Sequence, residues 1–222
     1  MRLKGLFNNK TVRNAGWIVG GRLINKLLSF VVGVLTARFL GPGNYGLIGY
    51  VGAYVTFFAS LCNLGINSVI IKDFVDHPQE EGAAIGTTIV LRAVSSLLSA
   101  VMIVGIVALA EHGDPAVIWV AVLSSFGLLF QVVDTIKRWF QARLQSKYAA
   151  VATVLSYIIV SGYKLCLMIT GKNVFWFAMA TSVEYLVVAA VLLLAYKKNQ
   201  GPSFSFSFRK AKELLRPMKS IN

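Results

Sequence analysis

The chain has 222 residues, of which 56% are hydrophobic and only 14% are charged, and it carries a net charge of +13. Its mean hydropathy of +0.68 is far above that of a soluble globular domain and predicts an all-α, polytopic membrane protein. The positive charge does not indicate a nucleic-acid partner, because the basic residues are divided among the segments between apolar runs instead of forming one continuous face.

The first apolar run, residues 17–39, is long enough to cross a bilayer but contains Arg22, Asn25 and Lys26. A charge at the centre of a bilayer costs at least about 2.5–3.5 kcal/mol. Helical geometry places Arg22 and Lys26 on one polar stripe, which predicts that this face looks into a protein interior or a wet cavity. The alternative is snorkelling of both side chains to the interface, which suits Arg22 better than Lys26.

Five more apolar segments follow the first, and turn signals such as Gly41-Pro42-Gly43-Asn44 and Gly171-Lys172-Asn173 separate them. The sequence therefore predicts a bundle of six transmembrane helices. Their expected ranges are about 15–39, 45–66, 83–110, 116–136, 149–170 and 174–196.

The distribution of basic residues predicts the orientation of this bundle. With the N-terminus in the cytoplasm, sixteen Lys and Arg residues between the helices lie on the cytoplasmic side, whereas only Arg38 and Lys172 lie outside. The cytoplasmic set is Arg2, Lys4, Lys10, Arg13, Lys72, Lys137, Arg138, Arg143, Lys147, Lys197, Lys198, Arg209, Lys210, Lys212, Arg216 and Lys219. This asymmetry predicts a cytoplasmic N-terminus.

Three further ionisable residues within the predicted helices bear on function: Arg92, Lys164 and Glu184. Glu184 lies near the middle of the sixth helix, where a carboxylate must be protonated, paired or bound to an ion. One interpretation is ion coupling, or a counter-ion role beside a substrate-binding base. The other is a structural ion pair with Lys164 or Arg92.

Bases outnumber acids inside the predicted membrane segments, which favours an anionic amphiphile moving through a polar cleft. Near the end of the fourth helix, Asp134 and Arg138 are four residues apart and predict a local ion pair. The candidate substrate-binding residues of the cleft are Arg22, Asn25, Lys26, Asn63, Arg92 and Lys164.

Signatures of catalysis are absent from the sequence. It contains no nucleophile elbow, no phosphate-binding glycine loop before a helix, and no His or Cys cluster with metal-ligand spacing. The two cysteines, Cys62 and Cys166, lie inside apolar runs and indicate no disulfide framework. We therefore expect a protein that is not an enzyme and that needs no cofactor or metal ion.

The residues after the sixth helix change character. Gly201-Pro202 breaks that helix, and residues 209–219 form a basic amphipathic stretch with Leu214, Leu215 and Met218 on its apolar side. We expect residues 199–222 to be a cytoplasmic tail on the inner membrane surface or a linker to a missing second lobe. A disordered basic tail is the alternative.

Thr36–Gly46 has the sequence TARFLGPGNYG. This stretch resembles the end of the first helix in polysaccharide (O-antigen) flippases of the multidrug/oligosaccharidyl-lipid/polysaccharide exporter superfamily. Two later motifs of these flippases have similar stretches here, in the same order. They are Leu64-Gly65-Ile66 with Ile70-Ile71-Lys72, and Trp139–Ala142 with Lys147-Tyr148-Ala149. Lys164 and Glu184 also fall where such sequences often carry a Lys and a Glu.

The resemblance implies a multi-pass protein of the bacterial inner membrane that turns undecaprenyl-diphosphate-linked oligosaccharides from the cytoplasmic to the periplasmic leaflet. It implies two lobes of six or seven helices around a basic cavity, so we expect this chain to be one N-terminal lobe that does not flip lipids alone. Its partners would be the lipid-linked oligosaccharide, membrane lipids, and a second lobe or a second copy. The alternatives are a truncated, non-transporting membrane or assembly subunit, and a drug or lipid exporter of the same superfamily.

Overall fold

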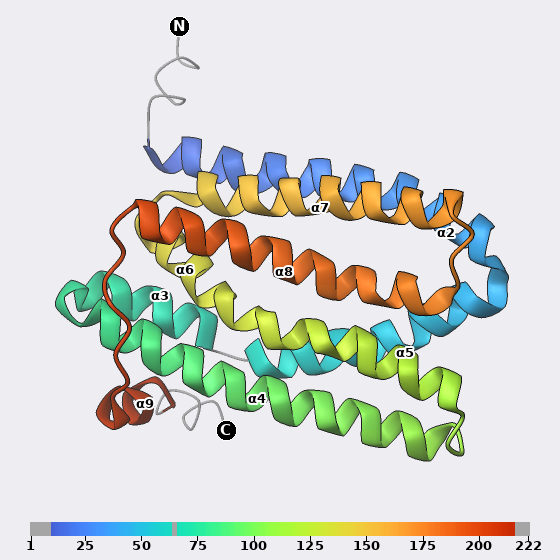
Figure 1. The fold of residues 1–222 in the computed structure, drawn as a ribbon. Helices are drawn as coiled ribbons and strands as arrows, with labels where there is room; N and C mark the ends of the chain where they lie inside the picture. The colour runs from blue at the N-terminus through green and yellow to red at the C-terminus, as the bar shows by residue number, and fades with distance from the viewer. Residues whose placement is uncertain (1–9, 64–65, 216–222) are drawn as a thin grey trace, which may run out of the picture.

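The computed structural model describes residues 10–63 and 66–215, and over these residues the chain is helical, with no strand among them. The long helices lie side by side in an elongated bundle (Figure 1). The elements are α2 (Lys10–Asn63), α3 (Ile66–Asp76), η1 (Pro78–Glu80), α4 (Glu81–Ala110), α5 (Pro115–Ser125), η2 (Phe126–Val133), α6 (Asp134–Ala142), α7 (Ser146–Ile169), α8 (Val174–Lys198) and α9 (Phe208–Leu215).

Five described helical segments are long and apolar enough to cross a membrane, whereas six were predicted. They are Asn14–Leu61, Pro78–Ala110, Pro115–Ala142, Ser146–Ile169 and Val174–Lys198. The counts differ because the first two predicted helices are joined in α2, which has 54 residues and a kink at Gly41. A straight helix of that length would measure about 81 Å, against a hydrocarbon core of about 30 Å.

The kink in α2 has a local cause. Gly41 adopts φ 72° and ψ 171°, a conformation almost restricted to glycine, and the following Pro42 has no N–H to donate to the helix. Figure 1 shows the second arm of α2 turning back beneath the first. The two arms come close near the bend, because a Cβ built on Gly33 would lie 3.8 Å from the Tyr45 hydroxyl.

One predicted helix boundary was wrong. The predicted fourth helix continues through η2, where it tightens to a 3₁₀ geometry, and through α6 to Ala142. The predicted end of the second helix at residue 66 adjoins residues 64–65, which lie outside the described residues; α2 is described up to Asn63, and α3 is described from Ile66. Helix α3 is amphipathic, and Ile70 and Phe74 are buried on its apolar face.

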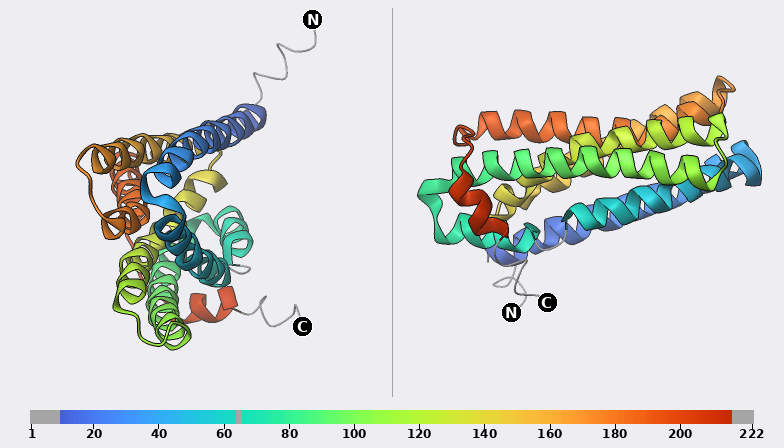
Figure 2. Two further views of the ribbon diagram at one scale, coloured as in Figure 1. Left: turned by 90° about the vertical axis from the view of Figure 1, so that its right-hand side faces the viewer. Right: turned by 90° about the horizontal axis from the view of Figure 1, so that it is seen from below.

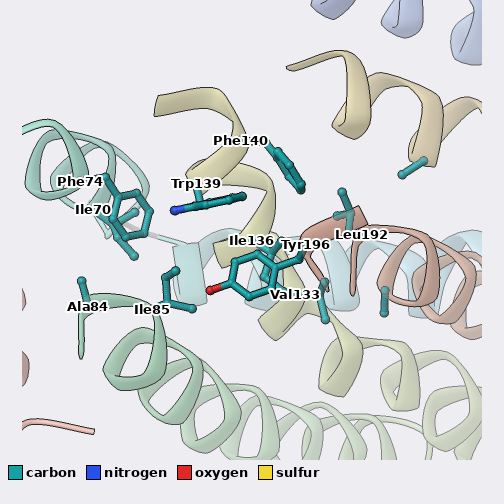
Figure 3. Close-up of a cluster of buried hydrophobic side chains, with 12 residues drawn as sticks. Ile70, Phe74, Ala84, Ile85, Val133, Ile136, Trp139, Phe140, Leu192 and Tyr196 are labelled. Atoms are coloured by element: carbon teal, nitrogen blue, oxygen red, sulfur yellow. The ribbon is translucent and has the colours of Figure 1, made fainter. Parts of the chain in front are cut away.

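The elements have a consistent polarity along the bundle. Helices α3, α6 and α9 lie at one end with the first turns of α2 and α7, and we call this the α9 end (Figures 1 and 2). The bend of α2, whose kink is at Gly41, and the α4–α5 and α7–α8 connections lie at the opposite end, which we call the Gly41 end. At the α9 end, Trp139 packs against Phe140 and Tyr196 with ring centroids 5.0 and 4.9 Å apart (Figure 3).

The segment after α8 docks on the bundle. Ser205 N donates to Gly82 O at 3.1 Å and Ser207 N donates to Thr87 Oγ1 at 3.0 Å, so this segment follows the start of α4. Helix α9 then packs on α3 and α4, with Leu214 2% exposed. Residues 216–222, including Met218, and the side chain of Leu215 lie outside the described part of the predicted tail.

Candidate functional site

A basic pocket lies between the first arm of α2, helix α6 and the start of α7, towards the α9 end. Its volume is about 490 Å³, and three cationic side chains line it without an acidic residue among the lining. The lining residues are Ile18, Gly21, Arg22, Asn25, Lys137, Arg138, Gln141, Ser146, Ala149, Ala150 and Thr153. Because opposite charge is missing from this lining, the pocket favours an anionic ligand.

Helix geometry brings the α2 residues of the pocket together. Ile18, Arg22 and Asn25 are spaced by four and three residues, so they share one face of the first arm of α2. The sequence had placed Arg22 on one polar stripe with Lys26. Lys26 is exposed and is not part of the pocket lining. Of this predicted stripe, Arg22 lines the pocket, and Asn25, a separately predicted substrate-binding residue, lines it beside Arg22.

Helix α6 supplies the other two cations, and Arg138 is fixed by two hydrogen bonds. Its Nε donates to Asn67 Oδ1 at 3.1 Å and its Nη1 donates to Gln141 Oε1 at 2.9 Å. The local ion pair predicted between Asp134 and Arg138 does not form among the described side chains. Asn67 reaches Arg138 from α3, 71 residues away in the chain, and orients the guanidinium at the pocket wall.

The N-terminus of α7 adds a partial positive charge to the same pocket. Ser146 is the first residue of this 24-residue helix, and its backbone N–H donates to Asn14 Oδ1 at 2.7 Å. Helix N-termini attract anions through their free N–H groups and the helix dipole. The pocket thus combines three full charges with the positive end of a helix.

Two buried polar atoms of the pocket residues have no hydrogen-bond partner in the described structure. They are Asn25 Oδ1 and Ser146 Oγ, on side chains that are 9% and 0% exposed. An unsatisfied buried polar group costs about 1–3 kcal/mol. A hydrated or hydroxyl-bearing anion in the pocket would offer partners to both atoms, so their state is consistent with a ligand site.

Arg92 lies against the pocket rather than in its lining. It is 2% exposed, and its Nη2 donates to the same Asn67 Oδ1 at 2.5 Å. One neutral amide oxygen therefore holds two guanidinium groups, those of Arg92 and Arg138. This arrangement places a further positive charge behind the pocket wall.

The remaining predicted site residues lie elsewhere or outside the described side chains. Lys164 and Glu184 are both half-buried on α7 and α8, and Glu184 has Lys164 and Lys137 as its charged neighbours. No salt bridge of 4.0 Å or less joins Glu184 to either in the described structure. Arg92 bonds Asn67 instead, and the side chain of Asn63 lies outside the described part.

Sequence reasoning did not select Lys137, Gln141, Ser146 or Asn67 as site residues. Lys137, Arg138 and Gln141 share one face of α6, and this spacing was the only local signal available. The roles of Ser146 and Asn67 depend on contacts between segments far apart in the chain. No local pattern could have revealed those two residues.

A second, hydroxyl-lined cleft of about 720 Å³ lies between the second arm of α2, η2 and α8. Thr56 and Ser60 come from α2, Gln131 from η2, and Thr181 and Tyr185 from α8. These side chains can donate and accept hydrogen bonds with neutral polar groups. The described residues contain no group of three or more His, Cys, Asp or Glu that could hold a metal ion.

A family model described as "Polysaccharide biosynthesis protein" matches residues 11–220. The match covers the basic pocket, the hydroxyl-lined cleft and the docked segment after α8. No curated protein and no solved structure matches the chain.

Proposed function

The chain belongs to the polysaccharide biosynthesis protein family, and we propose that it carries undecaprenyl-diphosphate-linked oligosaccharides across the bacterial inner membrane. Family membership and the long apolar helices together give it a membrane role in polysaccharide biosynthesis. The basic pocket is the observation that supports transport of a diphosphate-linked lipid. Arg22, Lys137 and Arg138 meet there without an acidic residue in the lining.

A diphosphate is the part of such a lipid that suits the basic pocket. Arginine binds phosphate oxygens through two parallel N–H bonds, and charge-assisted hydrogen bonds are about twice as strong as neutral ones. Arg138 is already oriented by Asn67 and Gln141, so less rotamer freedom is lost when it binds. The hydroxyl-lined cleft suits the neutral sugars of the same substrate, whose hydroxyls match Thr56, Ser60 and Thr181.

The proposed membrane arrangement counts each arm of α2 as one span, which gives six spans with the α9 end in the cytoplasm. The described basic residues between the spans lie at the α9 end, apart from Arg38 and Lys172, as the positive-inside rule requires. The basic pocket then lies towards the cytoplasmic leaflet, where it would receive the diphosphate. Alternating access needs a facing bundle, which a second lobe or a second copy would supply.

Binding of inorganic diphosphate by the purified chain in nanodiscs tests the proposal. We expect Arg138→Gln to weaken binding at least about tenfold, since a hydrogen bond to a charged group contributes about 1.5–3 kcal/mol. Lys172→Gln is the matched control, because Lys172 is an exposed cation at the Gly41 end. Equal affinities for wild type and Arg138→Gln, measured by calorimetry at fixed salt, would refute the diphosphate site.

Export of surface polysaccharide by cells tests transport itself. With its native partners present, Arg138→Gln should reduce export while Lys172→Gln leaves it unchanged. Membrane abundance of both variants, measured by immunoblotting, controls for misfolding. Normal export in Arg138→Gln at equal abundance would contradict the proposed transport role of the pocket.

A further inference from the structure

An apolar groove of about 1170 Å³ lies along the contact between α2 and α7. Its walls are aliphatic or aromatic side chains and glycines, and several remain open: Trp17 is 46%, Val151 is 49% and Ile158 is 53% exposed. The lining residues are Val12, Gly16, Trp17, Gly20, Gly21, Ile24, Ala150, Val151, Val154, Leu155 and Ile158. The α2 part extends over about 18 Å, from Val12 to Ile24.

The groove and the basic pocket share two lining residues, Gly21 and Ala150. The helices approach closely there, because a Cβ built on Gly21 would lie 3.3 Å from Ala150 Cβ. On α2, Ile18, Arg22 and Asn25 line the pocket, whereas Trp17, Gly20 and Ile24 line the groove. A cationic site and an apolar channel thus lie back to back at the same level of the bundle, separated by one helix–helix contact.

We propose that this groove holds the isoprenoid chain of the lipid whose diphosphate occupies the basic pocket. The inference rests on the proposed function, since it takes the anionic head group as bound beside Arg22 and Arg138. An anionic head joined to an apolar chain is the chemistry that matches both cavities. The lining of the pocket, with Arg22, Lys137 and Arg138 and no acidic residue, supports an anionic head group independently of the groove's shape.

Glycines leave the space in which the chain would lie. Cβ atoms built on Gly16 and Gly20 meet nothing within 4 Å, so no described side chain occupies the volume above them. Gly21 differs, because it packs against Ala150 and sets the distance between the helices. Larger side chains at 16 or 20 would therefore fill the groove without displacing a described neighbour.

Photocrosslinking in nanodiscs tests the groove. The probe is a polyprenyl diphosphate with a diazirine in its chain, and the labelled peptides are identified by mass spectrometry. We expect labelling in residues 12–24 and 150–158 of wild type. Excess inorganic diphosphate, or Arg138→Gln, should reduce that labelling at least fivefold, because the head group anchors the chain.

Groove-filling variants provide the matched comparison. Gly20→Leu, or Gly16→Leu if the first variant fails to fold, should reduce groove labelling at least fivefold. Gly105→Leu is the control, because a Cβ on this α4 glycine also meets nothing within 4 Å. A neutral phosphatidylcholine carrying the same diazirine chain should label the groove without sensitivity to diphosphate.

Two labelling results would overturn the inference. In the first, excess inorganic diphosphate does not reduce labelling of the groove by the polyprenyl diphosphate probe. In the second, the neutral lipid labels the groove as strongly as that probe does. Crosslinking of the groove to a protein partner in native membranes, in place of the lipid probe, would also overturn it. If inorganic diphosphate still binds the basic pocket when either result is found, only the proposed isoprenoid site in the groove is wrong. If inorganic diphosphate does not bind wild type, the proposed function fails first.

Discussion

At the residue scale, Gly41 determines how the first two apolar runs are connected. Its φ of 72° and ψ of 171° lie in a region that side chains with a Cβ rarely adopt. Pro42 reinforces the break, because a proline disfavours helical conformation in the residue before it. The bend therefore depends on one glycine rather than on packing around it, since a Cβ there would meet nothing within 4 Å.

Replacing Gly41 by alanine should lower the free energy of unfolding by about 1–3 kcal/mol, the cost of forcing a Cβ into this conformation. Gly46→Ala is the control, because Gly46 is helical and also has open space around its Cα. That substitution should stabilise the chain by about 0.5–1 kcal/mol. Denaturant titration in micelles measures both, and equal stability of the two variants would contradict a glycine-dependent bend.

At the element scale, α9 is held on the bundle by a buried cation. Lys210 Nζ lies 3.0 Å from Asp73, 2.7 Å from Glu80 and 3.4 Å from Glu213, and its side chain is 2% exposed. Burial alone would lower the pKa of Lys210, but hydrogen bonds to Glu80 and Asp73 outweigh it and raise that pKa above 10.5. The stabilisation is lost as the pH rises through the raised pKa of Lys210, and it is lost at acid pH as Glu80, whose pKa the hydrogen bond from Lys210 lowers, becomes protonated.

Lys210→Met should release α9 from the bundle, because three carboxylates would lose their shared cation. We expect a local cost of about 1–3 kcal/mol, below that of a fully buried pair because Glu80 and Glu213 are partly exposed. Hydrogen–deuterium exchange of residues 203–215 should accelerate at least about fivefold. Lys212→Met, at an exposed lysine of α9, should leave exchange unchanged. Unchanged exchange in Lys210→Met would show that the ion cluster does not hold the element.

At the scale of the whole molecule, charge and apolar surface are arranged as a bilayer requires. Large apolar side chains remain exposed along the bundle, such as Leu109 at 84% and Ile169 at 87%. Exposed apolar surface of this kind is stable in lipid and unfavourable in water. The basic residues of α6, α9 and the end of α8 lie together at the α9 end. The bundle therefore has one polar, basic end that is suited to the cytoplasmic surface.

A topology experiment tests this arrangement. A reporter fused after Lys198 should be active in the cytoplasm, and one inserted at Glu111–Asp114 should be active in the periplasm. The physical reason is the basic asymmetry, because Lys and Arg near span ends are retained in the cytoplasm. Reporter activity and protease protection in spheroplasts give independent measurements. The reverse pattern would contradict both the orientation and the proposed location of the basic pocket.

The sequence alone determined the helical, membrane-embedded character and the turn at Gly41, and it placed Arg22 on a polar stripe of the first helix. These features depend on composition and on a period of about 3.6 residues, which neighbours in the chain specify. Only the tertiary structure decided that Arg138 bonds Asn67 rather than Asp134, and that Lys137 and Ser146 complete the pocket. It also showed that Lys210 is buried among carboxylates. Those contacts join segments 71 or 137 residues apart, and helix packing rather than local periodicity selects them.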